Sequence, residues 1–168
     1  SIYTSSGAIQ NAVILIGTEL PDDDLTVDAD IAASGGNGSV SLSAAGDILH
    51  TAGTVSAAGS GGVDLNAGTA ADDGAVTMSP GTTLSSVTGP ISVHADGTTA
   101  LNDVTSVSGD VSVTAGDVAL NGTVASTGAL ALQPSTAART IGLGGGAGDF
   151  SLDDTELANL SDGFSAIT

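Results

Sequence analysis

The sequence predicts an all-β protein, a right-handed parallel β-helix (β-solenoid) with about 20 residues per coil. A short glycine-led motif recurs along the 168 residues, and each copy alternates apolar and polar residues as a strand with one buried face does. Aromatic residues make up only 2% of the chain. Stacked coils enclose a narrow core that small aliphatic side chains fill, so the composition agrees with the periodicity.

The repeat is a glycine followed by two apolar residues with one small or polar residue between them. The last three intervals between copies are 20, 19 and 20 residues, and the interval from residue 38 to residue 61 is 23. A copy at residue 74 falls inside a 28-residue interval, where we expect an extra strand or an inserted loop. A degenerate copy, DDLTVDA, begins at residue 23. The copies are GSVSLSA at 38, GGVDLNA at 61, GAVTMSP at 74, GPISVHA at 89, GDVSVTA at 109, GALALQP at 128 and GDFSLDD at 148.

Two further strands are predicted in each coil. The segments AGDILHTAGTV (residues 45–55) and AGDVALNGTV (residues 115–124) share a Gly-Asp turn, an aliphatic strand and a Gly-Thr-Val tripeptide that opens a third strand. Three short strands separated by such turns describe one triangular coil. Because successive coils stack about 4.8 Å apart, equivalent residues should form inward columns. One such column is expected to contain Val40, Val63, Ile91, Val111, Leu130 and Phe150.

We divide the chain into three parts. Residues 1–22 are expected to be leading strands that continue from a preceding coil, and NAVILIG (residues 11–17) within them is expected to be one buried strand. Residues 23–139 carry the solenoid repeats, and residues 140–168 form a Gly-rich terminal module that continues the solenoid. Within this module, residues 152–160 fit either a helix or a strand-turn-strand.

An immunoglobulin-like β-sandwich is the competing architecture, because it also has strands at intervals of roughly ten residues. Sandwich strands usually bury Trp and Tyr, whereas the aromatic residues here are Tyr3, Phe150 and Phe164 alone. The hydrophobic content of 40% argues against a disordered chain. The solenoid therefore remains the predicted fold.

The charge of the chain excludes several functions. Nineteen acidic residues face a single basic residue, Arg139, which gives a net charge of −18. Nucleic acid is excluded as a partner, because phosphate binding needs clustered Lys and Arg. The absence of cysteine excludes disulfides and thiolate metal sites. The longest aliphatic run, residues 12–16, is too short for membrane insertion, and residues 1–10 do not resemble a signal peptide.

The repeat GDVSVTAGDVALNGTVAST (residues 109–127) resembles the repeats of filamentous-haemagglutinin-like exoproteins, the large bacterial adhesins exported by two-partner secretion. The segment of residues 140–168 is similar to a module that recurs in very large, repetitive bacterial surface proteins. The resemblance implies a secreted, extracellular and non-enzymatic role at the cell surface, as a structural stalk or fibre segment. Host or surface glycans are possible partners under this resemblance.

The two ends of the sequence predict further strand. Neither SIYTSSGA nor GFSAIT resembles the polar cap that ends a natural solenoid. We expect the chain to be a piece of a longer polypeptide. Each end should continue into further coils of the same chain or of an identical chain stacked end to end, because unpaired strand edges template further pairing.

A carbohydrate-binding or carbohydrate-processing β-helix is the alternative function. A lyase needs a base beside the sugar carboxylate, and Arg139 stands alone. A hydrolase needs two converging carboxylates, for which the sequence offers Asp64, Asp72, Asp73 and Asp96. Aspartate at a coil corner is more often a turn residue, so we expect no enzyme. Ice or mineral binding would need regular T-x-T rows, which the sequence lacks.

The remaining motifs predict little chemistry. His50 and His94 occupy different places in the repeat, so we expect two lone surface histidines rather than a shared metal site. Serines are too frequent to carry information. The segment GLGGGAG (residues 142–148) predicts a flexible turn rather than a phosphate cradle, because it lacks a following helix and a Walker lysine.

Calcium is the one cofactor that the sequence makes worth testing. Hard cations prefer clustered carboxylate and carbonyl oxygens, and three aspartate pairs are candidates. No EF-hand loop or calcium-binding nonapeptide repeat is present, so a solvated acidic corner is the competing interpretation. The candidate ligands are Asp22, Asp23, Asp72, Asp73, Asp153 and Asp154.

Overall fold

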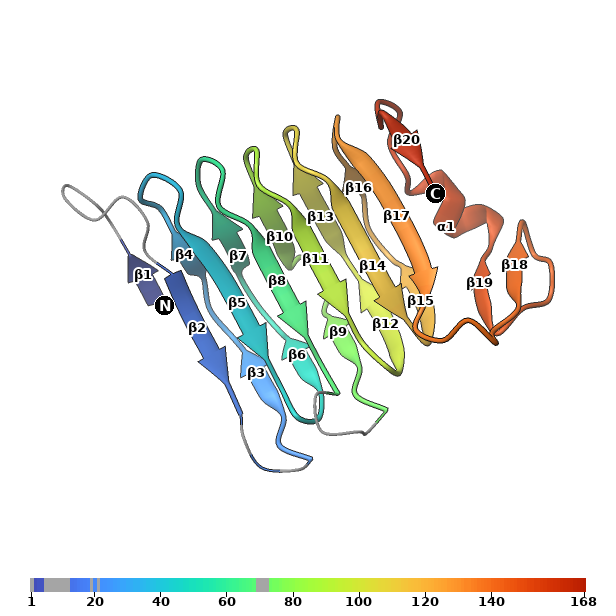
Figure 1. Cartoon of the computed structure of the whole chain (residues 1–168), viewed down its shortest axis with the longest axis horizontal. Coiled ribbons are helices and arrows are strands. Elements are labelled where there is room, and N and C mark those ends of the chain that lie inside the picture. Colours follow the sequence, from blue (N-terminus) through green and yellow to red (C-terminus); the bar gives the residue numbers. More distant parts are fainter. Residues whose placement is uncertain (1, 5–12, 19, 21, 69–72) are drawn as a thin grey trace.

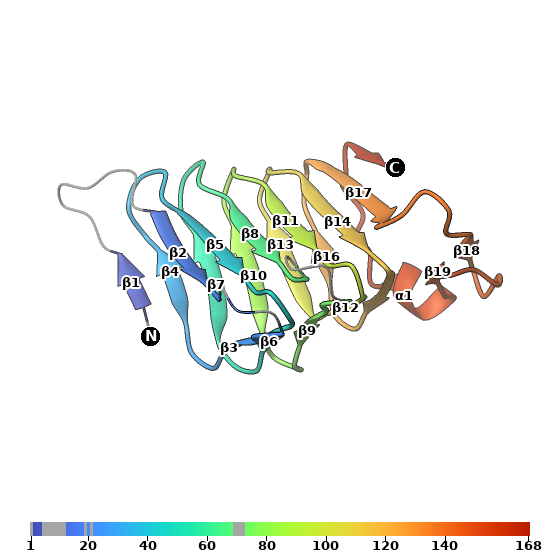
Figure 2. The same cartoon turned by 60° about the horizontal axis from the view of Figure 1, so that its bottom comes forward.

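The computed structural model describes residues 2–4, 13–18, 20, 22–68 and 73–168. Its strands form three parallel sheets, which we name A, B and C, of 6, 7 and 5 strands, and a separate 2-stranded sheet. Figure 1 shows the strands of sheet B side by side along the long axis, with sheet A behind them. Figure 2 brings sheet C forward as the third side. The predicted parallel β-solenoid is confirmed.

The strands are short and follow one another around the solenoid. Sheet A contains β1 (Ile2–Thr4), β4 (Ile31–Ala33), β7 (Thr54–Ala57), β10 (Thr83–Ser86), β13 (Asp103–Ser106) and β16 (Val124–Ala125). Sheet B contains β2 (Val13–Gly17), β5 (Ser39–Ser43), β8 (Val63–Asn66), β11 (Ile91–His94), β14 (Val111–Ala115), β17 (Ala129–Pro134) and β20 (Ala166–Ile167). Sheet C contains β3 (Leu25–Val27), β6 (Ile48–His50), β9 (Val76–Met78), β12 (Thr98–Leu101) and β15 (Asp117–Leu120). The separate sheet pairs β18 (Ile141–Leu143) with β19 (Phe150–Leu152), and one helix follows, α1 (Asp154–Ala158).

Each coil passes through sheets A, B and C in turn, so that β4, β5 and β6 form the second coil. Two copies of the sequence motif therefore belong to sheet C and not to sheet B. The degenerate copy at residue 23 forms β3, and the copy at residue 74 forms β9. The extra length of the third coil lies in the connection before β9, as an inserted loop would place it. Apolar alternation marks any half-buried strand, so the motif alone did not distinguish the sheets.

The predicted inward column is correct for five of its six residues. Val40, Val63, Ile91, Val111 and Leu130 are in register across sheet B and are buried. Phe150 is buried, but it pairs with Ile141 on β18, and Ile167 takes the next place in the column beside Leu130. The prediction failed there because the 20-residue spacing was extended across a segment that leaves the regular coil. At the other end, Ile14 continues the column beside Val40.

The segment NAVILIG forms β2 but is not buried on both faces. Ile14 points inward and is 6% exposed, whereas Leu15 points outward and is 76% exposed. The strand alternates as the other strands of sheet B do. A run of consecutive aliphatic residues had hidden this alternation.

Glycine builds the corner between sheets A and B. A Cβ atom at Gly128 would lie 2.6 Å from the carbonyl oxygen of Gly109, so no side chain fits between these stacked backbones. The same close approach recurs along the whole row, in which each glycine faces the carbonyl group of the one before it. This contact explains the glycine that leads each of the repeats that form sheet B. The row contains Gly38, Gly61, Gly89, Gly109 and Gly128.

Buried serines complete this corner. The Ser86 hydroxyl donates to the carbonyl oxygen of Gly89 (2.8 Å), and the Ser126 hydroxyl donates to that of Gly109 (2.6 Å). The amide of Gly109 in turn donates to the Ser106 hydroxyl (2.8 Å). Serine was treated as uninformative in the sequence, but these three side chains satisfy backbone groups that the sheets leave unpaired.

The C-terminal segment forms an atypical last turn of the solenoid. Helix α1 settles the open choice at residues 152–160: Asp153 caps it, and the Glu156 side chain reaches back to the Asp153 amide in a capping box. Leu160 then bridges to Val124 of sheet A, and β20 pairs with β17. The segments SIYTSSGA and GFSAIT thus contribute the strands β1 and β20, within the part of the chain that the structure describes.

Candidate functional site

Several acidic side chains gather at the corner where the chain passes from sheet B to sheet C. Equivalent corner positions of the first three coils stack here, so aspartates far apart in the sequence become neighbours. They surround an open hollow of about 260 Å³. Its lining is formed by Asp22, Asp24, Gly46, Asp47, Asp73 and Gly74.

Two of these carboxylates bind the backbone of the next coil. Asp24 Oδ1 accepts a hydrogen bond from the amide of Asp47, and Asp47 Oδ1 accepts one from the amide of Ala75, each at 2.8 Å. A corner amide has no partner in a sheet ladder, so a side-chain oxygen from the preceding coil satisfies it.

The same use of aspartate recurs at the other corners of the solenoid. Each carboxylate accepts a hydrogen bond from a backbone amide later in the chain. For three pairs the amide is 24, 20 or 19 residues later, which is about one coil, and for Asp117 it is 34 residues later. The further pairs are Asp30 with Thr54, Asp103 with Thr123, Asp110 with Ala129 and Asp117 with Ser151.

The structure describes five of the six predicted calcium ligands and places them at opposite ends of the solenoid. Asp22 and Asp73 line the acidic hollow together with Asp24 and Asp47, which were not among the predicted ligands. Asp153 and Asp154 lie at the start of α1 at the other end of the solenoid.

Of the remaining two candidates, Asp23 is not among the residues that line the hollow. Asp72 falls outside the part of the chain that the structure describes, and Asp23 uses its backbone oxygen to accept from Gly46 and Thr18. No group of three or more acidic or histidine side chains among the described residues is arranged to hold a metal ion. Calcium binding stays a prediction.

Among the described carboxylates considered for hydrolysis, Asp73 and Asp96 lie on neighbouring coils at the corner between sheets B and C, whereas Asp64 lies on the outer face of sheet B. Asp64 points outward from β8 and accepts a hydrogen bond from the Ser41 hydroxyl at 3.2 Å. Asp96 follows β11, where its carboxylate lies 3.7 Å from the His94 imidazole. Asp73 belongs to the acidic hollow, which Asp64 does not line.

The two histidines differ in burial. His94 lies on the outer face of sheet B, as predicted. His50 is fully buried, so its prediction as a surface residue was wrong. The signal was present in the sequence, because His50 is two residues after Ile48 in a strand and therefore shares its inward face. Burial lowers the pKa of the His50 imidazole, and the nearby backbone of Gly53 and Ala52 opposes this shift.

Arg139 lies further along the corner between sheets B and C. It lines a second hollow, of about 420 Å³, together with Asp73 and Gly116. Its Nε atom is buried and has no hydrogen-bond partner among the described residues. Hydrogen bonds from Thr140 to Asp149 lower the pKa of that carboxyl group, and the charge of Arg139 adds a smaller effect.

The glycine-rich segment 142–148 forms a turn, as predicted. Gly144 and Gly145 adopt positive φ angles of 61° and 80° between β18 and β19. Helix α1 begins after β19 and does not directly follow the glycine turn, so the chain lacks the strand, glycine loop and helix order of a phosphate cradle.

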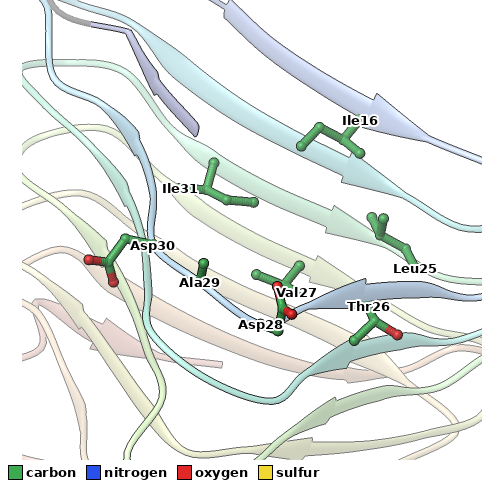
Figure 3. Close-up of a pocket in the computed structure, with 8 residues that line it drawn as sticks. All are labelled: Ile16, Leu25, Thr26, Val27, Asp28, Ala29, Asp30 and Ile31. Atoms are coloured by element: carbon green, nitrogen blue, oxygen red, sulfur yellow. The ribbon is translucent and has the colours of Figure 1, made fainter. Parts of the chain in front are cut away.

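A third hollow lies at the N-terminal end of the solenoid (Figure 3). It has a volume of about 190 Å³ and is lined mainly by residues 25–31. Leu25 and Val27 point toward the space with Ile16 and Ile31 around it, whereas Asp30 is turned away at the edge. The apolar core is thus open at the edge formed by β2 and β3.

No family model, curated protein or solved structure matches this chain in comparisons with known proteins. The parallel β-solenoid repeat is therefore the classification that the chain's own structure supports. No helix among the described residues is long and apolar enough to span a membrane.

Proposed function

We propose that this chain is a structural stalk or fibre segment of a large secreted bacterial surface adhesin or extracellular filament. The observation that carries the proposal is the pairing pattern. The three sheets run in register along the whole solenoid, and the strands β1, β2 and β3 at its N-terminal end are edge strands that each pair on one side only. A continuous core of this kind resists bending and keeps a fixed length, which is what a stalk requires.

The open end supports the idea that coils continue through stacking. Among the described residues, β2 and β3 pair on one side only, and the apolar hollow beside them leaves side chains such as Leu25 partly exposed. A further coil, from the same polypeptide or an identical chain, would pair with these edges and fill the hollow. The extracellular location that we propose for the chain rests on the resemblance of its repeats to those of exported adhesins.

The stacking is tested by sedimentation velocity and electron microscopy across a salt series. The charge of −18 opposes association and is screened as ionic strength rises. We expect monomers at low salt and elongated end-to-end particles at high salt. Leu25→Lys, at the open end, should prevent this growth, whereas Val107→Lys, at a position 65% exposed in the middle of the solenoid, should not. A compact monomer at every salt concentration would argue for a self-contained binding domain.

The surface location is tested separately. Antibodies raised against the segment should label intact cells of the organism that produces the chain. Labelling only after permeabilisation contradicts the adhesin or filament assignment without affecting the fold.

Carbohydrate binding is the second candidate, and the outer face of sheet B favours it. One polar side chain from each of five successive strands is in register along this flat face, at the spacing of the coils. The row contains Ser43, Asn66, His94, Thr114 and Gln133. Glycan-array binding that is lost in Asn66→Ala and retained in Ser85→Ala, on sheet A, would support this function.

A further inference from the structure

His50 is buried in an apolar part of the core. Its side chain is fully buried, and its register partners on the neighbouring strands of sheet C are Val27 and Met78. Neither ring nitrogen has a hydrogen-bond partner among the described residues. Neutral imidazole still has one donor and one acceptor. The backbone of Gly53 and Ala52 lies near the ring and favours its protonated form, but this effect on the pKa is smaller than that of burial.

The charged groups around His50 do not compensate a positive charge. The titratable residues on the strands and connections packed against β6 are aspartates at exposed or half-buried positions, and none forms an ion pair with the imidazole. Protonation of His50 would therefore place an unpaired cation in the core, which is strongly unfavourable. These aspartates are Asp22, Asp23, Asp24, Asp28, Asp30, Asp47 and Asp73.

We propose that His50 is a proton-sensitive element that opens the solenoid around its second coil on mild acidification. In the folded chain the imidazole stays neutral, whereas in the opened coil it meets water and takes up a proton. The folded state thus binds fewer protons than the opened state once the pH falls below the ordinary imidazole value of about 6.5. The opening equilibrium then rises up to tenfold for each further pH unit, until the folded state is protonated too.

The position of His50 decides which part opens. β6 has only three residues and is the sole link in sheet C between β3 and β9. Release of β6 exposes the inner edges of both neighbours and separates the first coil from the rest of sheet C. The acid-induced opening therefore occurs at one end of the solenoid. The proposal does not depend on whether the chain is part of a stalk.

The composition of the chain makes the effect measurable. His50 and His94 are the only histidines, and the chain has no cysteine, so few other groups change charge between about pH 5 and 8. His94 lies on the surface, and its side chain is 45% exposed. It provides a matched control for the loss of one imidazole.

The experiment compares urea unfolding of the wild-type chain, His50→Met and His94→Gln between about pH 5 and 7.5. Methionine matches Met78 in the same column and carries no proton. We expect the folding equilibrium constant of the wild type and of His94→Gln to fall by up to tenfold per pH unit at the acidic end, and that of His50→Met to stay flat. Equal pH dependence of the wild type and His50→Met overturns the proposal.

A second measurement does not depend on the folding of the variant. Histidine NMR resonances of the wild type report each ring separately, and His94→Gln assigns the two signals. The His50 ring should remain neutral well below pH 6.5 in the folded state. A His50 pKa at or above the value of a free imidazole overturns the proposal. Amide exchange at Leu49 and His50 should rise with acidification, before that of sheet C at β12 and β15.

Discussion

The glycine row at the corner between sheets A and B gives a graded stability prediction. Gly128 and Gly109 face the carbonyl groups of the preceding coil, and a methyl group at either position has no space. Gly17 provides the control, because a Cβ atom there would lie 3.5 Å from its nearest neighbour, the carbonyl oxygen of Ser43. None of these three glycines has a positive φ, so alanine can adopt their backbone conformations.

The contact distances set the size of the effect. Ordinary van der Waals contact begins at 3.4 Å, and the Cβ atom of Gly128→Ala would lie 2.6 Å from the Gly109 oxygen. Two stacked backbones must then separate by about 0.8 Å, since both atoms belong to the main chain or are fixed to it. Overpacking of this kind costs about 1–3 kcal/mol, against a gain of about 0.4–1 kcal/mol from the lower entropy of unfolded alanine.

We therefore expect a net loss of about 1–2 kcal/mol for Gly128→Ala and a larger loss for Gly109→Ala, whose Cβ atom would lie closer still to the Gly89 carbonyl group. Gly17→Ala should be neutral or slightly stabilising. The assay is equilibrium urea unfolding followed by far-ultraviolet circular dichroism, with the midpoint and slope fitted separately because a repeat protein can lose cooperativity. Coincident curves for the three variants, or an equal loss in Gly17→Ala, would refute the steric reasoning.

Three further outcomes follow from the corners. Asp110→Ala should lose about 1 kcal/mol, because the amide of Ala129 loses its acceptor, and Asp110→Asn should retain most of this stability in the same urea assay, since the amide oxygen can still accept. Ser126→Ala should lose about 2 kcal/mol of stability, because the Gly109 carbonyl and the Gly128 amide are left unpaired in a buried site. Ser112→Ala, on the outer face of sheet B, should change the stability little. Equal losses in the two variants would contradict the role of the buried hydroxyl. If the acidic hollow binds calcium, millimolar calcium should raise the melting temperature reversibly. The double variant Asp22→Asn, Asp73→Asn should abolish this rise, whereas Asp153→Asn should not. Identical melting curves with calcium and with chelator, at matched ionic strength, would show that the hollow is a solvated acidic corner without bound calcium.

The fold was predictable because each coil repeats the same local pattern. The alternation around Val111 and Val113 identified a strand with one buried face, and the near-constant spacing placed Val111 beside Ile91 and Leu130. The prediction failed at Phe150, where the interval of 20 residues was unchanged but the chain had left sheet B for a turn of its own. Spacing gives register only while the intervening corners keep the same length.

The acidic hollow was predictable only in part. Adjacent aspartates drew attention to Asp22 and Asp73. Asp24, in the same run as Asp22, was not singled out, and Asp47 joins these residues only through stacking between coils. The roles of Asp24 and Asp47 as acceptors for the next coil are long-range contacts that no local motif encodes. The burial of His50 could have been read from its phase in the strand, whereas the absence of a ring partner depends on the packing of neighbouring coils.

The corner aspartates also bear on why the chain is so acidic. The amide of Ser60 is satisfied by Asn37, whose side chain accepts at 3.2 Å without carrying a charge. The hydrogen bond between coils therefore does not require a carboxylate, yet aspartate occupies most of the other corner positions described above. A carboxylate strengthens the bond, and it also gives every coil a negative rim that repels the side of a neighbouring solenoid. Edge pairing along the axis is directional and depends less on charge than contact between rims does. Under the proposed end-to-end stacking, the aspartates would therefore favour growth at the ends over lateral association.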